Sequence, residues 1–144
     1  MAAETHIELA NDLAEVTRLA AAVEAFGDEH GLSKGTIFAL NLALEELVTN
    51  VIMHGDVEPG RRAVALRLSV DGSTLRVVVS DDAREFNPLE REEPNLGSDI
   101  EARGVGGLGV HLIKKLMDDI AYRRENGKNV LSMRKTMTEG TSLR

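Results

Sequence analysis

Two pairs of short alternating runs constrain the fold of this chain more than any other feature. Each pair is joined by a dipeptide that favours a tight turn: residues 63–70 and 75–80 flank Asp71-Gly72, and residues 120–124 and 130–134 flank Asn126-Gly127. Asp-Gly and Asn-Gly between alternating apolar and polar residues are strong signals of β-hairpins. The sequence therefore predicts two antiparallel hairpins, one in the middle of the chain and one near its end.

The remaining elements are predicted from their periodicity. Residues 5–9 alternate weakly, which favours a short edge strand. Apolar residues recur at helical spacing over residues 13–26 and again over residues 37–52, and the second of these helices is expected to be largely buried. A further short helix is expected at residues 110–117, between the two hairpins.

Capping residues set the expected ends of the two long helices. Asn11 is predicted to be the N-cap of the first helix, and Gly27 or Gly31 to end it. Ser33 is the expected N-cap of the second helix, which should run to about Met53. These ends leave only short connections between the helices and the first hairpin.

The order of elements indicates the fold class. Strands and helices are segregated along the chain, which predicts an α+β protein and not an alternating α/β one. We expect a two-layer sandwich, in which helices cover one face of a mixed, mainly antiparallel sheet. The 144 residues fit a single domain spanning residues 1–144.

Composition narrows the function classes. The formal net charge is −7, so binding to a phosphate backbone is not expected. Trp is absent and Cys is absent, which leaves little for base stacking and nothing for thiolate metal sites. No apolar run reaches the roughly 18 residues of a spanning helix, and the first residues do not resemble a signal peptide. We therefore expect a cytoplasmic protein that binds neither membranes nor nucleic acid.

Glu46 and Asn50 form a polar pair on the largely apolar second helix. Their spacing of four residues places them on the same helix face. A polar stripe facing water would explain the pair equally well at this level. The functional alternative is a metal–nucleotide site, in which the Asn50 amide oxygen binds Mg²⁺ and the Glu46 carboxylate accepts a proton. Glu45 is a rival for the second role.

Asp81 follows directly after the apolar run of the first hairpin. An aspartate in this position can simply be a turn residue. Alternatively, an ionised carboxylate accepts hydrogen bonds only, so it suits a donor such as the exocyclic amine of adenine. Placed in an apolar slot, such a carboxylate would discriminate against bases that lack this amine.

A glycine cluster at residues 104–109 precedes the last predicted helix. Glycine allows backbone amides to approach phosphates closely, and the N-terminus of a helix favours anions. The cluster also matches G-x-G-x-x-G, but no strand precedes it and no β-α-β unit follows, so a dinucleotide fold is not expected. A protein-kinase glycine loop fails as well, because no following strand carries the required lysine. A plain flexible loop remains the alternative.

Taken together, the three signals resemble the boxes of the GHKL (Bergerat-fold) ATPases. The motifs are Glu46-x-x-x-Asn50, Asp81-x-Ala83 and Gly107-Leu-Gly109, in that order and at fitting spacing. Within that superfamily, the segments LEELVTNVIMHG, DDAREFNPL and GVGGLGVHLIKKLMDDIAYRRENGKNVL resemble the small anti-sigma factor serine kinases. The resemblance covers nearly the whole chain.

The resemblance implies a role for each matching residue. Glu46 would be the general base, Asn50 would bind Mg²⁺, and Asp81 would bind the adenine amine of ATP. The remaining expected cofactor-binding residues are Ala83, Arg103, Gly104, Gly106, Gly107, Leu108, Gly109 and Asn129. Residues 87–107 would form an ATP lid. Two positions depart from the family pattern, since Ala83 replaces the usual Gly and Asn129 the usual Thr.

The resemblance also implies partners. Members of this family bind a sigma factor and phosphorylate a Ser or Thr of a STAS-domain anti-anti-sigma protein, and they commonly form homodimers. Two other functional classes are alternatives. A non-catalytic module could bind ATP and sequester a regulator, whereas a sensor-histidine-kinase domain would need a dimerising helical hairpin for which this chain has no room.

Overall fold

The structure is a computed structural model that describes residues 3–55, 57–90 and 107–137. Five strands form one sheet: β1 (Ala3–Ala10), β2 (Arg62–Asp71), β3 (Thr74–Asp81), β4 (Asp119–Glu125) and β5 (Lys128–Thr136). Their order across the sheet is β1-β2-β3-β5-β4, and each neighbouring pair is antiparallel. The described sheet is therefore antiparallel throughout, where a mixed sheet was expected.

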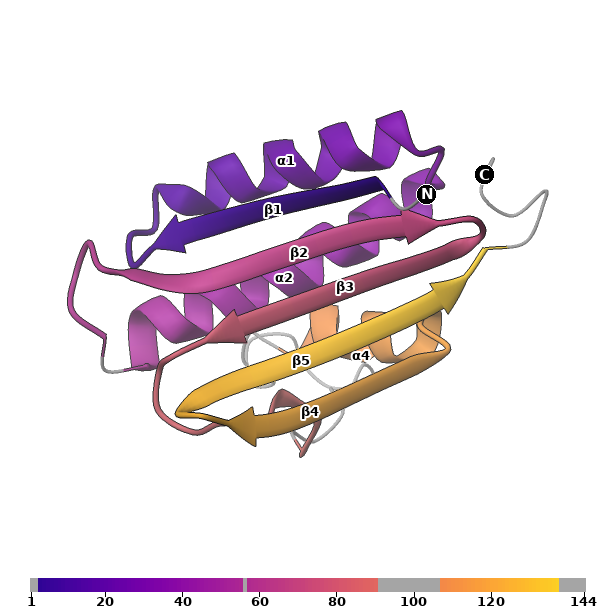
Figure 1. Ribbon diagram of the computed structural model, residues 1–144. Helices are drawn as coiled ribbons and strands as arrows, with labels where there is room; N and C mark the ends of the chain where they lie inside the picture. Colours follow the sequence, from indigo (N-terminus) through magenta and orange to yellow (C-terminus); the bar gives the residue numbers. More distant parts are fainter. Residues whose placement is uncertain (1–2, 56, 91–106, 138–144) are drawn as a thin grey trace, which may run out of the picture.

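The helices lie on one face of this sheet (Figure 1). They are α1 (Glu15–Glu29), α2 (Lys34–His54) and α4 (Leu108–Leu116), with a short 3₁₀ turn, η1, at Pro88–Glu90. Helix α2 lies between the other two helices in this view, and α4 runs behind β5 and β4. The α+β sandwich expected from the order of elements is confirmed.

Both predicted hairpins form at the predicted turns. Gly72 has a φ of +63°, and Asn126 and Gly127 have φ of +52° and +75°. Positive φ at both central residues is the requirement of a type I′ turn, which Asn-Gly meets at low cost. The two hairpins then pair through β3 and β5, which places Asp81 directly opposite Asn129.

The caps agree with the sequence in part. Ser33 is the N-cap of α2, where its Oγ accepts a hydrogen bond from the Thr36 amide at 3.1 Å. Asn11 is not the N-cap of α1, because that helix begins at Glu15 with Ala14 in the cap position. The Asn11 side chain is buried instead and donates to the carbonyl oxygen of Val57 at 2.8 Å. A partner 46 residues away therefore replaced the local cap.

The end of α1 also decides between two predictions. The helix continues through Gly27, which is buried inside it, and Gly31 follows the helix in a left-handed conformation with a φ of +71°. A side chain at Gly27 would meet Ile37 of α2 at 2.5 Å. Gly27 thus allows α1 and α2 to pack closely, and Gly31 lies in the turn that follows the end of α1.

The core lies between the sheet and the three helices. Its largest fully buried members are Leu9, Leu19, Val23, Phe26, Leu40, Leu44, Val48, Leu66, Leu68, Leu75, Val77 and Ile113. Helix α2 has the length and apolar composition of a membrane span, although the sequence had not predicted one. Seven of its residues are buried in the described structure.

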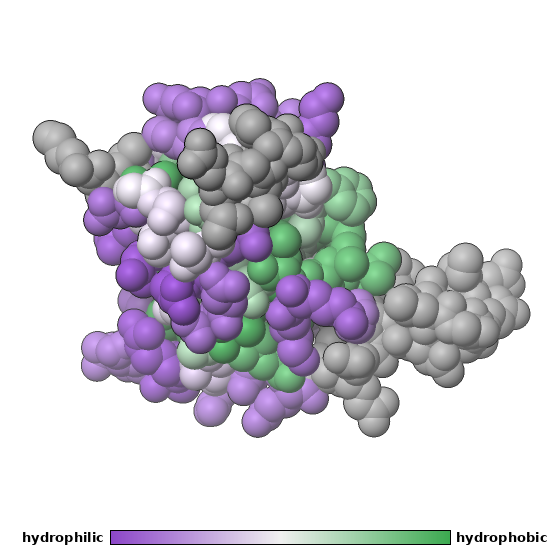
Figure 2. All heavy atoms as spheres, turned by 90° about the vertical axis from the view of Figure 1, so that its right-hand side faces the viewer, coloured by the Kyte–Doolittle hydropathy of each residue, from purple (hydrophilic) through white to green (hydrophobic). Residues whose placement is uncertain are grey.

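Some apolar surface stays open. The exposed large apolar residues are Leu13, Phe38, Met53, Phe86 and Leu108. Figure 2 shows an apolar area on the end of the molecule that lies at the right of Figure 1, bordered by hydrophilic residues. Contiguous apolar areas of this kind, in contrast to single exposed apolar side chains, are typical of surfaces that contact a partner.

Candidate functional site

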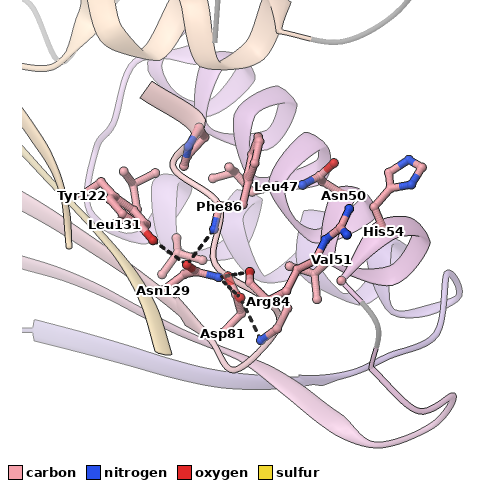
Figure 3. Close-up of a pocket in the computed structure, with 14 residues that line it drawn as sticks. Leu47, Asn50, Val51, His54, Asp81, Arg84, Phe86, Tyr122, Asn129 and Leu131 are labelled. Atoms are coloured by element: carbon pink, nitrogen blue, oxygen red, sulfur yellow. Dashed lines mark hydrogen bonds between the residues drawn. The ribbon is translucent and has the colours of Figure 1, made fainter. Parts of the chain in front are cut away.

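A pocket of about 190 Å³ lies between the C-terminal half of α2 and the adjacent ends of β3, β4 and β5 (Figure 3). Apolar side chains form most of its wall: Leu47, Val51, Val79, Phe86 and Leu131. Its polar side chains are Asn50, His54, Asp81, Arg84, Tyr122 and Asn129. The pocket is smaller than the several hundred Å³ of a typical ligand cavity, so it can enclose a base while the rest of a nucleotide extends outside.

Asp81 reaches this pocket because it is the last residue of β3. Its Oδ1 accepts hydrogen bonds from the Asn129 amide nitrogen at 2.8 Å and from the Ala83 backbone at 3.1 Å. Among the described residues, no donor reaches its Oδ2. Burial raises the pKa of the Asp81 carboxyl above its ordinary value, against the lowering effect of these two hydrogen bonds. The carboxylate is thus partly desolvated and has one acceptor oxygen to spare.

Asn129 is the centre of the polar network beside Asp81. Besides the bond to Asp81, its amide nitrogen donates to the carbonyl oxygen of Arg84 at 2.9 Å. Its Oδ1 accepts from the Phe86 backbone at 3.1 Å and from the Tyr122 hydroxyl at 2.6 Å. Every hydrogen-bonding group of this buried amide is satisfied. Asn129 therefore ties β5 and β4 to the segment that follows β3.

Two residues of β4 take part in this site that sequence reasoning missed. Tyr122 bonds Asn129, and the Arg124 guanidinium donates to the carbonyl oxygen of Ala83 at 2.8 Å. The signal was present, because alternation along β4 places Tyr122 and Arg124 on the same face as Ile120, which packs against the core.

Ala83 causes no strain at the position where the family usually has glycine. Its φ is negative, since Asn126 is the one described non-glycine residue with a positive φ. The Ala83 side chain is buried and lies over Gly55, where an added Cβ would come within 2.8 Å of the Ala83 methyl group. The small residue needed for this contact is thus Gly55 at the end of α2, and Ala83 fits beside it.

Glu46 does not point freely into solvent. One of its carboxylate oxygens accepts from the Gly109 amide at 3.0 Å and the other from the Val110 amide at 3.3 Å. These are N–H groups of the first turn of α4, which lack partners within the helix. The residue predicted to be the general base is therefore the cap of α4 in this structure. Glu45, its rival, is exposed.

Gly109 explains why α2 carries a small residue at Ala43. A Cβ added to Gly109 would lie 2.7 Å from the Leu42 carbonyl oxygen and 2.8 Å from the Ala43 Cα. The first turn of α4 thus packs on the α2 backbone itself. Gly107, with a φ of +86°, is the N-cap of α4, and Leu108 is partly exposed beside it.

Asn50 lies one turn after Glu46 and lines the pocket. Within the described part of the chain, its side-chain amide makes no hydrogen bond. A more open groove adjoins the pocket and shares Asn50, His54, Phe86 and Tyr122 with it. A single amide oxygen at the mouth of a pocket fits Mg²⁺, which takes few protein ligands and binds phosphates. The described residues contain no cluster of three or more His, Asp or Glu that would hold a metal alone.

Three predicted residues, Arg103, Gly104 and Gly106, and most of the predicted lid at 87–107 lie outside the described residues. The structure brings together Asn50, Asp81, Ala83 and Asn129 around one pocket. Glu46, Gly107, Leu108 and Gly109 lie instead where α4 begins against α2. The predicted residues thus form two neighbouring groups.

Residues 9–135 match the histidine kinase-like ATPase domain family, which is most of the chain. The chain belongs to this family. Serine-protein kinase RsbW of Listeria monocytogenes is 30% identical over 105 residues, which are 70% of this chain and 67% of that protein. RsbW of Bacillus subtilis is 28% identical over 105 residues, 69% of this chain and 65% of that protein. The chain thus spans about two thirds of the length of these relatives.

Solved structures agree with this histidine kinase-like ATPase fold. The RsbU and RsbW domains of a Mycobacterium tuberculosis protein superpose with a TM-score of 0.66 at 16% identity, covering 93% of this chain and 32% of that one. The histidine kinase domain of the blue-light activated histidine kinase from Erythrobacter litoralis EL346 gives a TM-score of 0.55 at 19% identity, covering 94% of this chain and 64% of that one. At these identities the likeness supports the fold.

Proposed function

We propose that this histidine kinase-like ATPase domain binds ATP with its base in the pocket and its phosphates toward Asn50 and the start of α4. The observation that carries the proposal is Asp81, a half-buried carboxylate in a largely apolar pocket with one oxygen not engaged by any described donor. Asn50 would hold Mg²⁺, which offsets phosphate charge when bound. Arg103 and Gly104–Gly106 are proposed to complete the phosphate side.

We further propose that the domain transfers the terminal phosphoryl group to a Ser or Thr of a STAS-domain anti-anti-sigma protein. Curated relatives are named serine-protein kinases, and Glu46 lies one helical turn before Asn50. In this role Glu46 accepts the proton of the attacking hydroxyl, while the site positions the two reactants. Binding of a sigma factor by the same cytoplasmic protein, as a homodimer, would complete a partner switch.

The test of transfer is incubation with Mg-ATP and the cognate STAS-domain protein, followed by mass analysis of that protein. We expect one phosphoryl group on a Ser or Thr. Glu46→Gln should reduce transfer by about 10²–10⁴-fold, the usual contribution of a general base. The exposed neighbour offers a matched control, since Glu45→Gln should transfer normally. An unmodified partner with wild-type protein that binds ATP well would exclude the kinase proposal.

One observation favours a second function, a non-catalytic ATP-binding module that sequesters a regulator. Both oxygens of Glu46 are engaged by α4 amides, so a base role requires their release. Gln has one acceptor oxygen and no charge, and Glu46→Gln should therefore also lower the free energy of unfolding by about 1 kcal/mol through loss of the cap. If Glu46 only caps α4, wild-type protein should transfer no phosphoryl group. Glu46→Gln should then lower the stability of the domain and leave its binding to the regulator intact.

A further inference from the structure

We propose that Tyr122 is a positioning residue that sets base specificity: its hydroxyl fixes the Asn129 amide, which leaves Asp81 Oδ2 as the acceptor for a 6-amino purine. This inference rests on the proposed binding of ATP in the pocket. Tyr122 belongs to β4 and Asp81 to β3, and Asn129 on β5, the strand between them, bonds both side chains. Figure 3 shows the three side chains in a row along the sheet side of the pocket.

Backbone groups determine which way the Asn129 amide faces. The Phe86 N–H can only donate, so the atom 3.1 Å from it must be the amide oxygen. The Arg84 carbonyl can only accept, so the atom 2.9 Å from it must be the amide nitrogen. Since the Tyr122 oxygen lies 2.6 Å from Asn129 Oδ1, its hydroxyl must be the donor. Burial raises the pKa of Tyr122, which keeps this proton in place.

The amide then has no hydrogen left for a ligand. Its two N–H groups go to the Arg84 carbonyl and to Asp81 Oδ1. Asp81 Oδ1 also accepts from the Ala83 amide, so the opposite carboxylate oxygen is the one that faces a base. Adenine offers an amine to it, whereas a 6-oxo purine offers a carbonyl oxygen, which the carboxylate repels. The preference for adenine over a 6-oxo purine follows because each hydrogen bond of the network has a fixed donor and a fixed acceptor.

Tyr122 restrains this amide from the side of β4. Without the hydroxyl, Oδ1 keeps only the longer bond from Phe86, and the amide can swing away from Asp81. An N–H released in this way can meet the oxygen of a 6-oxo purine, so the penalty against that base falls. The chain provides a control in Arg124, which lies opposite Asn129 on β4 and holds the same segment through the Ala83 carbonyl, with no described hydrogen bond to the Asn129 side chain. Its positive charge also lowers the pKa of Asp81.

The experiment measures dissociation constants of ATP and ITP at neutral pH, by calorimetry, for wild type, Tyr122→Phe and Arg124→Gln. We expect wild type to prefer ATP, and Tyr122→Phe to reduce the ratio of the two constants by about fivefold, the value of one hydrogen bond. Arg124→Gln should weaken both nucleotides alike and keep the ratio. Thermal unfolding of each variant establishes that it is folded.

Two results would overturn the inference while leaving ATP binding intact. One is an unchanged ATP-to-ITP ratio in Tyr122→Phe, and the other is an equal change of that ratio in Arg124→Gln, which would make general loosening of the segment responsible. A wild-type protein that binds neither nucleotide overturns the proposed function itself, and the inference with it. These outcomes are distinguishable in one set of titrations.

Discussion

The two sides of the site are built in different ways. On the side of the sheet, Asp81, Asn129 and Tyr122 are held by hydrogen bonds to one another and to backbone groups of the following segment. On the side of the helices, one carboxylate, Glu46, holds the first turn of α4, and Asn50 has no hydrogen-bond partner among the described residues. The base side is a network of several side chains, whereas on the helix side a single carboxylate makes the described side-chain hydrogen bonds to α4.

This difference separates recognition from transfer. A network whose members satisfy one another is formed before a ligand arrives, so base binding costs little rearrangement. The Glu46 carboxylate occupies the helix N-terminus that would otherwise attract an anion. The same carboxylate cannot cap α4 fully and accept a proton from a substrate. Transfer, in contrast to binding of the base, is therefore expected to require movement of Glu46 or α4.

The largest effect is expected from Asp81→Asn, which tests the base side. The new oxygen can keep both bonds of the present Oδ1, while the new NH₂ group meets the adenine amine as a second donor. ATP affinity should fall about 100-fold, the value of a hydrogen bond to a charged group together with the repulsion that replaces it. Calorimetric titration measures the affinity. An affinity within threefold of wild type would show that the base does not contact Asp81.

The difference in stability between this variant and wild type should depend on pH. Burial raises the pKa of Asp81 in the folded protein above its ordinary 3.8, so the folded state binds this proton more tightly. The resulting stabilisation is complete below pH 3.8 and is lost as the pH rises through the folded pKa. Without nucleotide, Asp81→Asn should thus unfold at a higher denaturant concentration than wild type at pH 7, and the difference should shrink in acid.

Gly109→Ala tests the helix side and should have the next largest effect. The added methyl group would lie 2.7–2.8 Å from backbone atoms of α2, so α4 must shift away from Glu46. We expect a loss of about 1–3 kcal/mol in the free energy of unfolding and weaker transfer, with the ATP-to-ITP ratio unchanged. Denaturant unfolding and nucleotide titration provide the two measurements.

Gly35→Ala is the control for this variant, since Gly35 is exposed in α2 and an added Cβ has its nearest neighbour 4.0 Å away. It should stabilise the protein by about 0.5–1 kcal/mol. A changed base preference in Gly109→Ala would contradict the separation of the two sides.

The smallest effect is expected from Ala83→Gly, at the position where the family usually has glycine. Loss of a buried methyl group and a more flexible unfolded chain should together reduce the free energy of unfolding by about 1 kcal/mol. ATP affinity should stay within about threefold, because the φ of Ala83 is already negative. A tenfold gain in affinity would mean that the Ala83 methyl group obstructs the base.

Local interactions explain what could be predicted from sequence. The turn at Asn126-Gly127 and the Ser33 cap involve residues within a few positions of each other, and both formed as expected. The alternating runs and helical periodicities gave the elements, and hence the α+β class. Asp81 was identified because it ends a strand, and its position opposite Asn129 required only the pairing of the two hairpins.

The sequence by itself thus determined the elements, their turns and three polar residues of the pocket, Asn50, Asp81 and Asn129. Only the tertiary structure decided their partners: that Glu46 caps a helix 63 residues away, that Asn11 bonds a distant loop, and that Tyr122 and Arg124 belong to the site. The physical reason is that a side-chain hydrogen bond depends on the position of its partner in space. Periodicity fixes which face a residue occupies, and packing alone fixes what it meets there.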